Sequence, residues 1–420
     1  MQEERFDAIV VGTGQSGPPL AVRLAGAGKR VAVIERDKFG GTCVNTGCIP
    51  TKTLVASART AWVAKNAAQW GVSAEGVRVD MKAVHARMKA VSGKSREGVE
   101  SWLRDAEGCT VITGHARFEG ERRLRVGDRV LVGDRIFVDV GGRPFVPKIP
   151  GLADVPHLTS SSMMEVDFLP RHLVVLGGSY IGLEFAQMYR RFGSEVTVLE
   201  REKRLVSRED DDVSDAIRAI LEAEGVRVET GAEVTRAEQK SGPVLHLADG
   251  RAIDGSHLLV AIGRVPNTHD LGLDKAGIKV DARGYIEVDD ELRTTAAEVW
   301  ALGDCNGKGA FTHTSYNDYE IVAANLLDGD TRRVSDRITA YGLFTDPPLG
   351  RCGMTEKEVR ASGKPALLAT MPMTRVGRAR ERGETQGLLK ALVDAESKRI
   401  LGVSFLGIEG DEVMHVVLDV

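Results

Sequence analysis

Two segments of the chain share one pattern: an apolar run, a glycine-rich turn, a helical pattern and a second apolar run. The first starts with FDAIVV at residues 6–11, passes through GTGQSG and ends with KRVAVIE at Glu35. The second starts with HLVVL at residues 172–176, passes through GGSYIG and LEFAQMYRRFG, and ends with SEVTVLE at Glu200. Continuous apolar runs of this length are typical of buried parallel strands. The pattern therefore predicts two β-α-β units.

The two units also agree in spacing. Glu35 follows Gly12 by 23 residues, and Glu200 follows Gly177 by the same number. A repeated supersecondary unit of this kind predicts two nucleotide-binding domains of doubly wound α/β type.

The rest of the chain predicts further elements and boundaries. Residues 51–105 have helical spacing, and residues 109–147 alternate as short strands. Glycine- and proline-rich stretches at 142–151 and 258–268 favour domain boundaries, and VWALGDC at 299–305 predicts a strand. A third unit starts near residue 341 and ends in a predicted helix at the last residue, so we expect the natural C-terminus to lie beyond it.

Composition narrows the class of protein. The chain is 42% hydrophobic, has a formal net charge of −4 and contains five cysteines. These values argue against global disorder, a dedicated nucleic-acid or anionic-membrane binder, and a disulfide-stapled fold. No apolar run reaches the ~20 residues of a membrane helix, and the acidic start is unlike a secretory signal. We therefore expect a cytoplasmic protein.

The first glycine loop predicts binding of a dinucleotide. Gly12, Gly14 and Gly17 permit a tight turn and close approach of the backbone to a pyrophosphate, which the N-terminus of the following helix attracts. Glu35 ends the next strand, where a carboxylate can accept hydrogen bonds from ribose hydroxyls. A kinase loop or a plain turn would share the glycines, but the chain has no HRD or DFG segment.

The second loop predicts binding of a nicotinamide dinucleotide. Ser179 replaces the middle glycine between Gly177 and Gly182. Glu200 favours a free 2′-hydroxyl and hence NADH over NADPH. Three basic residues follow and could instead bind a 2′-phosphate, or form a solvated turn: Arg201, Lys203 and Arg204.

The segment GGTCVNTGCIPTK at residues 40–52 predicts redox chemistry. A disulfide between Cys43 and Cys48 would close a very short loop, which makes a poor staple and a good redox switch. A helix N-terminus and Lys52 would both stabilise a thiolate. The alternatives are a zinc site, which needs two more ligands, and two unrelated thiols.

In order along the chain, seven segments resemble the class I pyridine nucleotide-disulfide oxidoreductases. They are GTGQSG, GGTCVNTGCIPTK, GGRPFVPKIPG, GGSYIGLE, AIGRVPNT, ALGDC and FTDPPLGRCGMTE. Details such as Pro18 and Pro19 are most similar to the mercuric-reductase-like branch, which includes copper-reducing flavoproteins of reactive-chlorine resistance. The resemblance implies an α/β fold with two Rossmann-like domains and an α+β dimerisation domain that is incomplete at its C-terminus. The implied bounds are FAD-binding 1–148 and 271–340, NAD(P)-binding 149–270, and dimerisation 341–420.

The resemblance also implies roles for individual residues. Cys43 and Cys48 would form the redox disulfide, with Lys52 beside the flavin and paired with Glu184, and no metal site is expected. FAD would be held by Gly12, Gly14, Gly17, Glu35, Gly41, Thr42, Lys52, His115, Ala116, Asp304, Thr312 and His313. NADH or NADPH would be held by Gly177, Ser179, Tyr180, Ile181, Gly182, Glu200 and Gly263, with Tyr180 covering the nicotinamide pocket.

The implied function is a homodimeric oxidoreductase that passes electrons from NAD(P)H through FAD to the dithiol, and then to Cu(II), Hg(II) or a small disulfide. The alternatives are a dihydrolipoamide dehydrogenase subunit and a non-catalytic flavin redox sensor. The chain lacks the family's C-terminal HPT-type His-Glu segment and the vicinal cysteines of mercuric reductases, which leaves mercury specificity unsupported.

Overall fold

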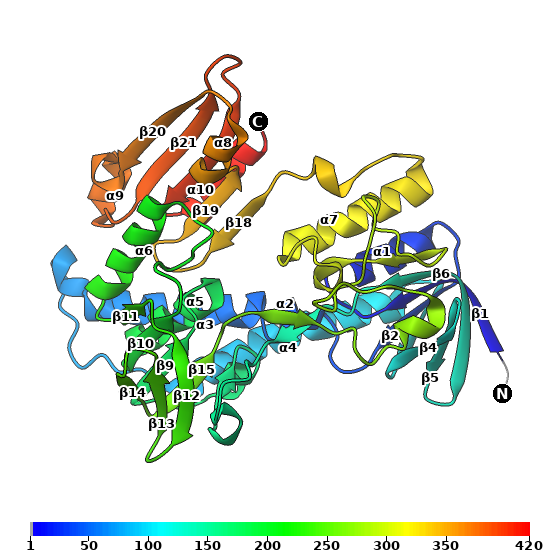
Figure 1. Ribbon diagram of the computed structural model, residues 1–420, viewed down its shortest axis with the longest axis horizontal. Coiled ribbons are helices and arrows are strands. Elements are labelled where there is room, and N and C mark those ends of the chain that lie inside the picture. Colours follow the sequence, from blue (N-terminus) through cyan, green and yellow to red (C-terminus); the bar gives the residue numbers. More distant parts are fainter. Residues whose placement is uncertain (1–2) are drawn as a thin grey trace. The chain divides into compact units, whose positions relative to one another are not determined.

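The computed structural model describes residues 3–420, which form two compact units built from interleaved segments (Figure 1). Of these residues, unit 1 comprises 3–51, Arg87–Pro144 and Gly263–Arg337, and unit 2 comprises Lys52–Ala86, Phe145–Ile262 and Ile338–Val420. The division differs from the sequence-based bounds in grouping Lys52–Ala86 with the second glycine loop. As a result, the long helices α3 (Cys48–Lys65) and α4 (Met81–Asp105) each contribute to both units.

Unit 1 is organised around a seven-stranded sheet. The parallel strands are β3 (Cys109–Thr113), β2 (Val31–Glu35), β1 (Glu3–Val11) and β6 (Arg129–Val138), with β17 (Val299–Ala301) also beside β6. Strands β5 (Arg123–Val126) and β4 (Ala116–Gly120) complete it in antiparallel fashion. Ile9 and Val10 are both fully buried but enter two different cores. The first apolar run is continuous because both faces of β1 are covered.

Two helices of unit 1 meet at the first glycine loop. Helix α1 (Gly17–Gly26) follows the loop directly, and α7 (Thr312–Ala323) packs against it. The Ser16 hydroxyl donates to the Ser315 carbonyl at 2.7 Å, and the two hydroxyl oxygens lie 2.6 Å apart. This contact joins the loop to a segment 299 residues away in sequence.

Unit 2 contains a parallel sheet of five strands that carries the second glycine loop. Their order is β11 (Arg227–Thr230), β10 (Glu195–Glu200), β9 (His172–Leu176), β15 (His257–Val260) and β8 (Leu158–Thr159). Helices α5 (Tyr180–Phe192) and α6 (Asp211–Ala223) connect these strands. An antiparallel meander follows, formed by β12 (Val234–Gln239), β13 (Pro243–Leu247) and β14 (Ala252–Asp254).

The C-terminal part of unit 2 is an antiparallel sheet, orange to red in Figure 1. Its order is β18 (Ala340–Leu343), β19 (Leu349–Gly353), β22 (Ile400–Leu406), β21 (Leu388–Asp394) and β20 (Ala366–Pro372). Helix α10 (Gly410–Leu418) packs on β19 and ends before the last residues of the chain. Together with the mixed sheet of unit 1 and the parallel sheet of unit 2, this C-terminal sheet and its helix give the expected α/β class with an α+β C-terminal domain.

One predicted strand is shorter than the sequence suggests. Strand β17 ends at Ala301, and Gly303–Asn306 form a 3₁₀ turn. Leu302 N still bonds to the Val138 carbonyl, but Gly303 N donates to the Asp318 carboxylate at 2.8 Å and draws the chain away from the sheet. Asp304 therefore lies on a turn at the end of the sheet and not within a strand.

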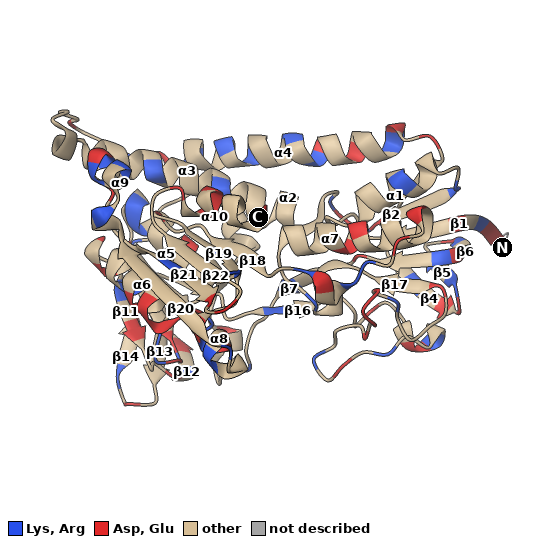
Figure 2. Cartoon of the chain, turned by 90° about the horizontal axis from the view of Figure 1, so that it is seen from above, with Lys and Arg blue, Asp and Glu red and all other residues tan. Residues whose placement is uncertain are grey.

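The surface carries charges of both signs. Figure 2 shows Lys and Arg interspersed with Asp and Glu along α4. One such pair, Arg104 and Glu100, lies 2.8 Å apart on that helix. Within residues 3–420, no helix combines the length and the apolar character that crossing a membrane requires.

Candidate functional site

The first glycine loop has the backbone geometry of a dinucleotide cradle. Gly12 has φ +103°, and a Cβ there would lie 2.1 Å from the Asp139 carbonyl, so only glycine fits. A Cβ on Gly17 would lie 2.5 Å from the Gly12 carbonyl. Glu35 accepts from Thr13 N at 3.1 Å and from the Thr13 hydroxyl at 2.6 Å. The carboxylate at the end of β2 is therefore fixed against the loop.

The second glycine loop repeats these contacts. Gly177 has φ +116°, and a Cβ there would lie 2.5 Å from the Ala261 carbonyl. A Cβ on Gly182 would lie 2.0 Å from the Gly177 carbonyl. Glu200 accepts from Gly178 N at 2.7 Å, as Glu35 accepts from Thr13 N. The duplication seen in the sequence thus extends to individual hydrogen bonds.

The two following helices differ at their N-termini: α5 has free N–H groups in its first turn, whereas in α1 Gly17 N bonds to the Asp139 carboxylate and Pro18 and Pro19 have no N–H. Ser16 and Ser179 precede α1 and α5 without a side-chain capping bond. Free N–H groups and the positive end of the helix dipole favour an anion at such a position. Ile181 and Gly182 lie in the first turn of α5. The second loop therefore offers a pyrophosphate both free N–H groups and a helix dipole, whereas the first offers the dipole and a backbone without side chains; the expected free N–H groups at the start of α1 are absent because Asp139 and two prolines occupy that turn.

Two of the three basic residues after Glu200 pair with acidic neighbours. Arg201 is 74% exposed in its side chain and pairs with Glu202 at 3.0 Å. Arg204 pairs with Asp211 at 3.5 Å and also binds Asp215. These contacts agree with the solvated-turn interpretation of this segment.

The two cysteines of the redox segment lie next to each other in unit 1. Cys43 is in the short helix α2 (Gly41–Asn45), and Cys48 is the first residue of α3. Both carry free thiols in this structure. The hydrogen bond with Cys48, followed by burial, raises the pKa of the Cys43 thiol well above its usual value. The Cys48 sulfur lies 2.9 Å from the Thr312 hydroxyl, which places the start of α7 against the pair.

The zinc alternative finds no support in the part of the chain that the structure describes. None of its His, Cys, Asp or Glu side chains form a group of three that could hold a metal ion.

His313 follows Thr312 on α7, and its ring stacks on that of Phe311 with centroids 5.6 Å apart.

Lys52 and Glu184 form a close ion pair within unit 2. The Lys52 ammonium lies 2.9 Å and 2.7 Å from the two carboxylate oxygens of Glu184. Glu184 is only 5% exposed and also accepts from Phe344 N at 3.0 Å. The Lys52 ammonium lies 4.2 Å from the centre of the Phe344 ring. The predicted partnership of Lys52 with Glu184 is therefore present, and it is not a chance pair of surface charges.

Other predicted residues cluster around the first loop. A Cβ on Gly41 would lie 2.9 Å from Gly14 Cα, so the start of α2 touches the loop. Arg264 donates to the Thr42 hydroxyl at 3.2 Å and lies 3.6 Å from the Asp304 carboxylate. Burial raises the pKa of Asp304 in spite of Arg264. The sequence analysis quoted the AIGRVPNT segment but did not single out Arg264.

His115 and Ala116 lie beside the end of β2. Gly114 N donates to the Glu35 carbonyl at 2.8 Å, which places both residues next to that strand end. The ring of His115 bonds to the Asp270 carbonyl at 3.2 Å, and Ala116 is buried. The ring of His115 is thus held by a hydrogen bond and remains partly exposed, whereas the side chain of Ala116 is packed in the core.

Asp139 is a buried acid that the sequence analysis missed. It is 4% exposed, and its carboxylate accepts from Gly17 N, the first residue of α1, at 2.7 Å. Burial raises its pKa well above the usual value, and the nearby acids Asp304, Asp318 and Glu35 add to the shift. A lone aspartate within the apolar segment IFVDV was the available signal.

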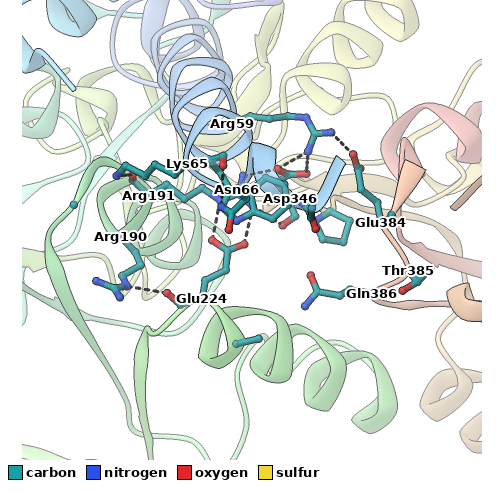
Figure 3. A pocket seen from close by; sticks show the side chains of 16 residues that line it. Arg59, Lys65, Asn66, Arg190, Arg191, Glu224, Asp346, Glu384, Thr385 and Gln386 are labelled. Carbon is teal, nitrogen blue, oxygen red and sulfur yellow. Dashed lines mark hydrogen bonds and ion pairs between the residues drawn. The ribbon is translucent and has the colours of Figure 1, made fainter. Parts of the chain in front are cut away.

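Unit 2 also contains a cavity of about 580 Å³ beside a buried ionic network (Figure 3). Arg191 binds Glu224 at 2.6 Å and also binds Asp346, which Arg59 contacts at 2.7 Å. Burial would raise the pKa of Asp346, but the two arginines lower it overall. Arg59 further binds Glu384 at 2.6 Å. The cavity wall contains none of the residues that the sequence analysis placed in the site.

Comparison with known proteins gives matches along almost the entire chain. Residues 6–318 match the family described as "Pyridine nucleotide-disulphide oxidoreductase", and residues 339–418 match the dimerisation domain of that family. The chain belongs to the pyridine nucleotide-disulphide oxidoreductase family.

Individual members of the family are similar over most of their length. The "Probable pyridine nucleotide-disulfide oxidoreductase RclA" of Escherichia coli is 38% identical, over 98% of this chain and 92% of that protein. A dihydrolipoyl dehydrogenase of Thermus scotoductus is 34% identical, over 97% and 89%. A mercuric reductase of Bacillus cereus is 31% identical over 98% of this chain but only 66% of that protein.

Solved structures agree with this membership. The HOCl-induced flavoprotein disulfide reductase RclA from Escherichia coli matches with a TM-score of 0.90, over 98% of this chain and 92% of that one. A Cu(II) complex of the same protein matches with a TM-score of 0.91, over 99% and 92%. Members of the family depend on FAD and use NAD(P)H, and this chain accordingly has the Rossmann-type FAD and NAD domains and the dimerisation domain of a flavin disulfide oxidoreductase.

Proposed function

We propose that the protein is a homodimeric NAD(P)H-dependent flavoenzyme whose Cys43–Cys48 pair passes electrons to Cu(II), Hg(II) or a small disulfide. The observation that carries the proposal is the adjacent pair of thiols next to Thr312, in the same unit as the first glycine loop. Bound FAD would accept a hydride from the nicotinamide and relay two electrons to sulfur. Those two electrons would convert one disulfide to two thiols, two Cu(II) to Cu(I), or one Hg(II) to metallic mercury.

The residues of unit 1 fit FAD. The glycines leave no side chain between the backbone and a pyrophosphate, and the positive end of the α1 dipole lies directly after the loop. Glu35 would accept the ribose hydroxyls. Asp139 accepts the hydrogen bond of Gly17 N and so fixes the start of α1 after the loop. The full set proposed to hold FAD is Gly12, Gly14, Gly17, Glu35, Gly41, Thr42, Lys52, His115, Ala116, Asp304, Thr312 and His313.

We propose that the second loop holds the nicotinamide dinucleotide and prefers NADH. Glu200 also accepts from Glu202 N at 2.8 Å, so its carboxylate is fixed at the end of β10, where a 2′-phosphate would be repelled. The residues proposed for this site are Gly177, Ser179, Tyr180, Ile181, Gly182, Glu200 and Gly263. The proposed domain bounds remain 149–270 for this domain, with FAD bound by 1–148 and 271–340 and dimerisation through 341–420.

Within the thiol pair, the two cysteines have different tasks. We assign Cys48, at the N-terminus of α3, to the flavin side, because the helix dipole favours a thiolate there. Cys43 keeps its proton because its pKa is raised, and it is the group that meets the acceptor. Thr312 can donate a hydrogen bond to the Cys48 thiolate.

The test is steady-state oxidation of NADH and NADPH by the flavin-loaded protein with Cu(II), Hg(II) or small disulfides. We expect sustained turnover with at least one of these acceptors and a lower KM for NADH than for NADPH. A Cys43→Ser protein should still take up electrons from NADH but lose turnover with thiol-dependent acceptors. Full metal reduction by that protein, or only a single turnover by the unaltered protein, would contradict the proposal.

Dihydrolipoamide oxidation is the second candidate. The 34% identity to a dihydrolipoyl dehydrogenase over 97% of this chain favours it. The assay is reduction of NAD⁺ by dihydrolipoamide. Turnover above that measured with metals or small disulfides would favour this function over the first.

A further inference from the structure

A buried carboxylate joins the second glycine loop to the C-terminal sheet. Glu209 is fully buried, and a single oxygen of its carboxylate, Oε1, accepts two tyrosine hydroxyls. The Tyr180 hydroxyl donates at 3.0 Å and the Tyr341 hydroxyl at 2.7 Å. The two rings meet edge to face, with centroids 5.7 Å apart. All three residues belong to unit 2.

The two tyrosines come from different parts of that unit. Tyr180 is the first residue of α5, directly after the loop that would bind the dinucleotide. Tyr341 lies in β18 of the C-terminal sheet. Glu209 lies just before α6, and its backbone carbonyl accepts from the Lys357 ammonium at 2.7 Å. The position of Tyr180 is therefore set by contacts outside the loop itself.

The hydroxyls are well suited to remain donors. Burial, and then the charge of Glu209, raise the pKa of both tyrosines, which stay protonated at physiological pH. The other oxygen of Glu209, Oε2, is buried and has no hydrogen-bond partner among residues 3–420. An unpaired buried carboxylate oxygen costs free energy, so the two tyrosyl hydrogen bonds are the compensation that keeps this carboxylate buried.

We propose that Glu209 is a positioning residue that holds Tyr180 over the nicotinamide site through an oxygen shared with Tyr341. The inference rests on the proposed function, in which Tyr180 covers that site. Entry of the nicotinamide ring displaces Tyr180 and breaks its hydrogen bond to Glu209. The adenosine half of the dinucleotide binds without this displacement. The hydrogen bond thus opposes binding of ligands that contain a nicotinamide ring and leaves other ligands of the loop unaffected.

The experiment compares two ligands on the flavin-loaded protein by calorimetry. One is 1,4,5,6-tetrahydro-NAD, which carries a reduced nicotinamide ring but transfers no hydride, and the other is ADP-ribose, which lacks the ring. Tyr180→Phe retains the ring of Tyr180 and removes only its hydroxyl, and Glu209→Leu removes the acceptor. We expect both variants to bind tetrahydro-NAD about threefold to tenfold more tightly, as expected for the loss of one hydrogen bond. Binding of ADP-ribose should change less than about twofold.

Two matched variants test the mechanism. Tyr341→Phe removes the other donor and leaves the Tyr180 bond in place, and Glu209→Gln keeps an acceptor oxygen. Tyr341→Phe should bind the two ligands as the unaltered protein does, and Glu209→Gln, a weaker acceptor, should tighten the binding of tetrahydro-NAD less than Glu209→Leu does. If Glu209→Leu fails to fold, Tyr180→Phe carries the comparison.

The outcomes are distinct. Equal changes for both ligands, no change with Tyr180→Phe, or an effect of Tyr341→Phe or Glu209→Gln as large as that of Tyr180→Phe would each overturn the role of Glu209. If the unaltered protein binds neither ligand, the proposed function itself fails. If it binds both and the ratio of affinities is insensitive to Tyr180→Phe, only the inference about Glu209 fails.

Discussion

The Lys52 ammonium is held by both carboxylate oxygens of Glu184, at 2.9 Å and 2.7 Å, although 132 residues separate them in sequence. The side chain of Glu184 is 7% exposed, whereas that of Lys52 is 33% exposed. Loss of the partner would therefore cost more free energy for the buried Glu184 carboxylate than for the Lys52 ammonium. This ion pair therefore fixes the side chain of Lys52, which lies four residues after Cys48 on α3.

Replacement of Glu184 should lower stability measurably. Glu184→Gln removes the negative charge but keeps the shape, and leaves Lys52 and Phe344 N with a weaker acceptor. We expect the free energy of unfolding in urea to fall by about 1–3 kcal/mol. The matched control is Asp328→Asn, which breaks the exposed pair with Arg23 and should change stability by less than about 0.5 kcal/mol. Equal effects of the two substitutions would contradict the special role of the Glu184 pair.

Removal of Cys48 should make Cys43 more reactive. The hydrogen bond and charge of Cys48 raise the pKa of Cys43, and serine at position 48 cannot supply that charge. In Cys48→Ser we expect Cys43 to react with iodoacetamide at pH 8 about tenfold faster than in the reduced unaltered protein. Mass spectrometry of each cysteine peptide measures this rate. Cys109 in the same samples is the internal reference and should react at an unchanged rate.

Asp139 should make stability depend on pH. The pKa of Asp139 is raised in the folded state. The contribution of Asp139 to stability is therefore complete below the ordinary aspartate pKa of about 4, and it is lost as the pH rises through the raised pKa. Asp139→Asn keeps an acceptor for Gly17 N and has no proton to lose. We therefore expect the stability of the variant, relative to that of the unaltered protein, to rise between pH 4.5 and pH 7.5.

The measurement is urea unfolding at both pH values. The exposed Asp128→Asn should show no such trend. A constant difference between Asp139→Asn and the unaltered protein across this range would show that burial of Asp139 does not affect its titration.

Substitutions in the two glycine loops should impair the binding of two different ligands, each without affecting the other. In Gly12→Ala the new methyl group would meet the Asp139 carbonyl at 2.1 Å, so we expect the protein to be purified without flavin colour. In Gly177→Ala the clash is with the Ala261 carbonyl at 2.5 Å, so flavin should be retained while ADP-ribose affinity falls at least about tenfold. The control is Gly98→Ala on α4, where the added methyl group would meet no atom within 4 Å. This variant should change neither property. Loss of flavin from Gly177→Ala would contradict the assignment of the loops.

The amino-acid sequence was sufficient to predict the local elements. The apolar runs at 6–11 and 172–176 became β1 and β9, and the equal spacing of Gly12–Glu35 and Gly177–Glu200 became two matching sets of hydrogen bonds. Such features depend on short-range constraints, namely the period of buried side chains and the conformations open to glycine. The segment CVNTGC likewise brought two thiols together because only four residues lie between them. The family followed from the order of these motifs.

Tertiary structure decided which distant groups meet. The pairing of Glu209 with Tyr180 and Tyr341, and of Asp139 with Gly17, joins positions between 29 and 132 residues apart. No local periodicity encodes such contacts, because they depend on how sheets and helices pack once formed. The same packing gives Glu209 and Asp139 their buried surroundings. A side chain's exposure, and with it the cost of its charge, is set by residues brought in from elsewhere in the chain.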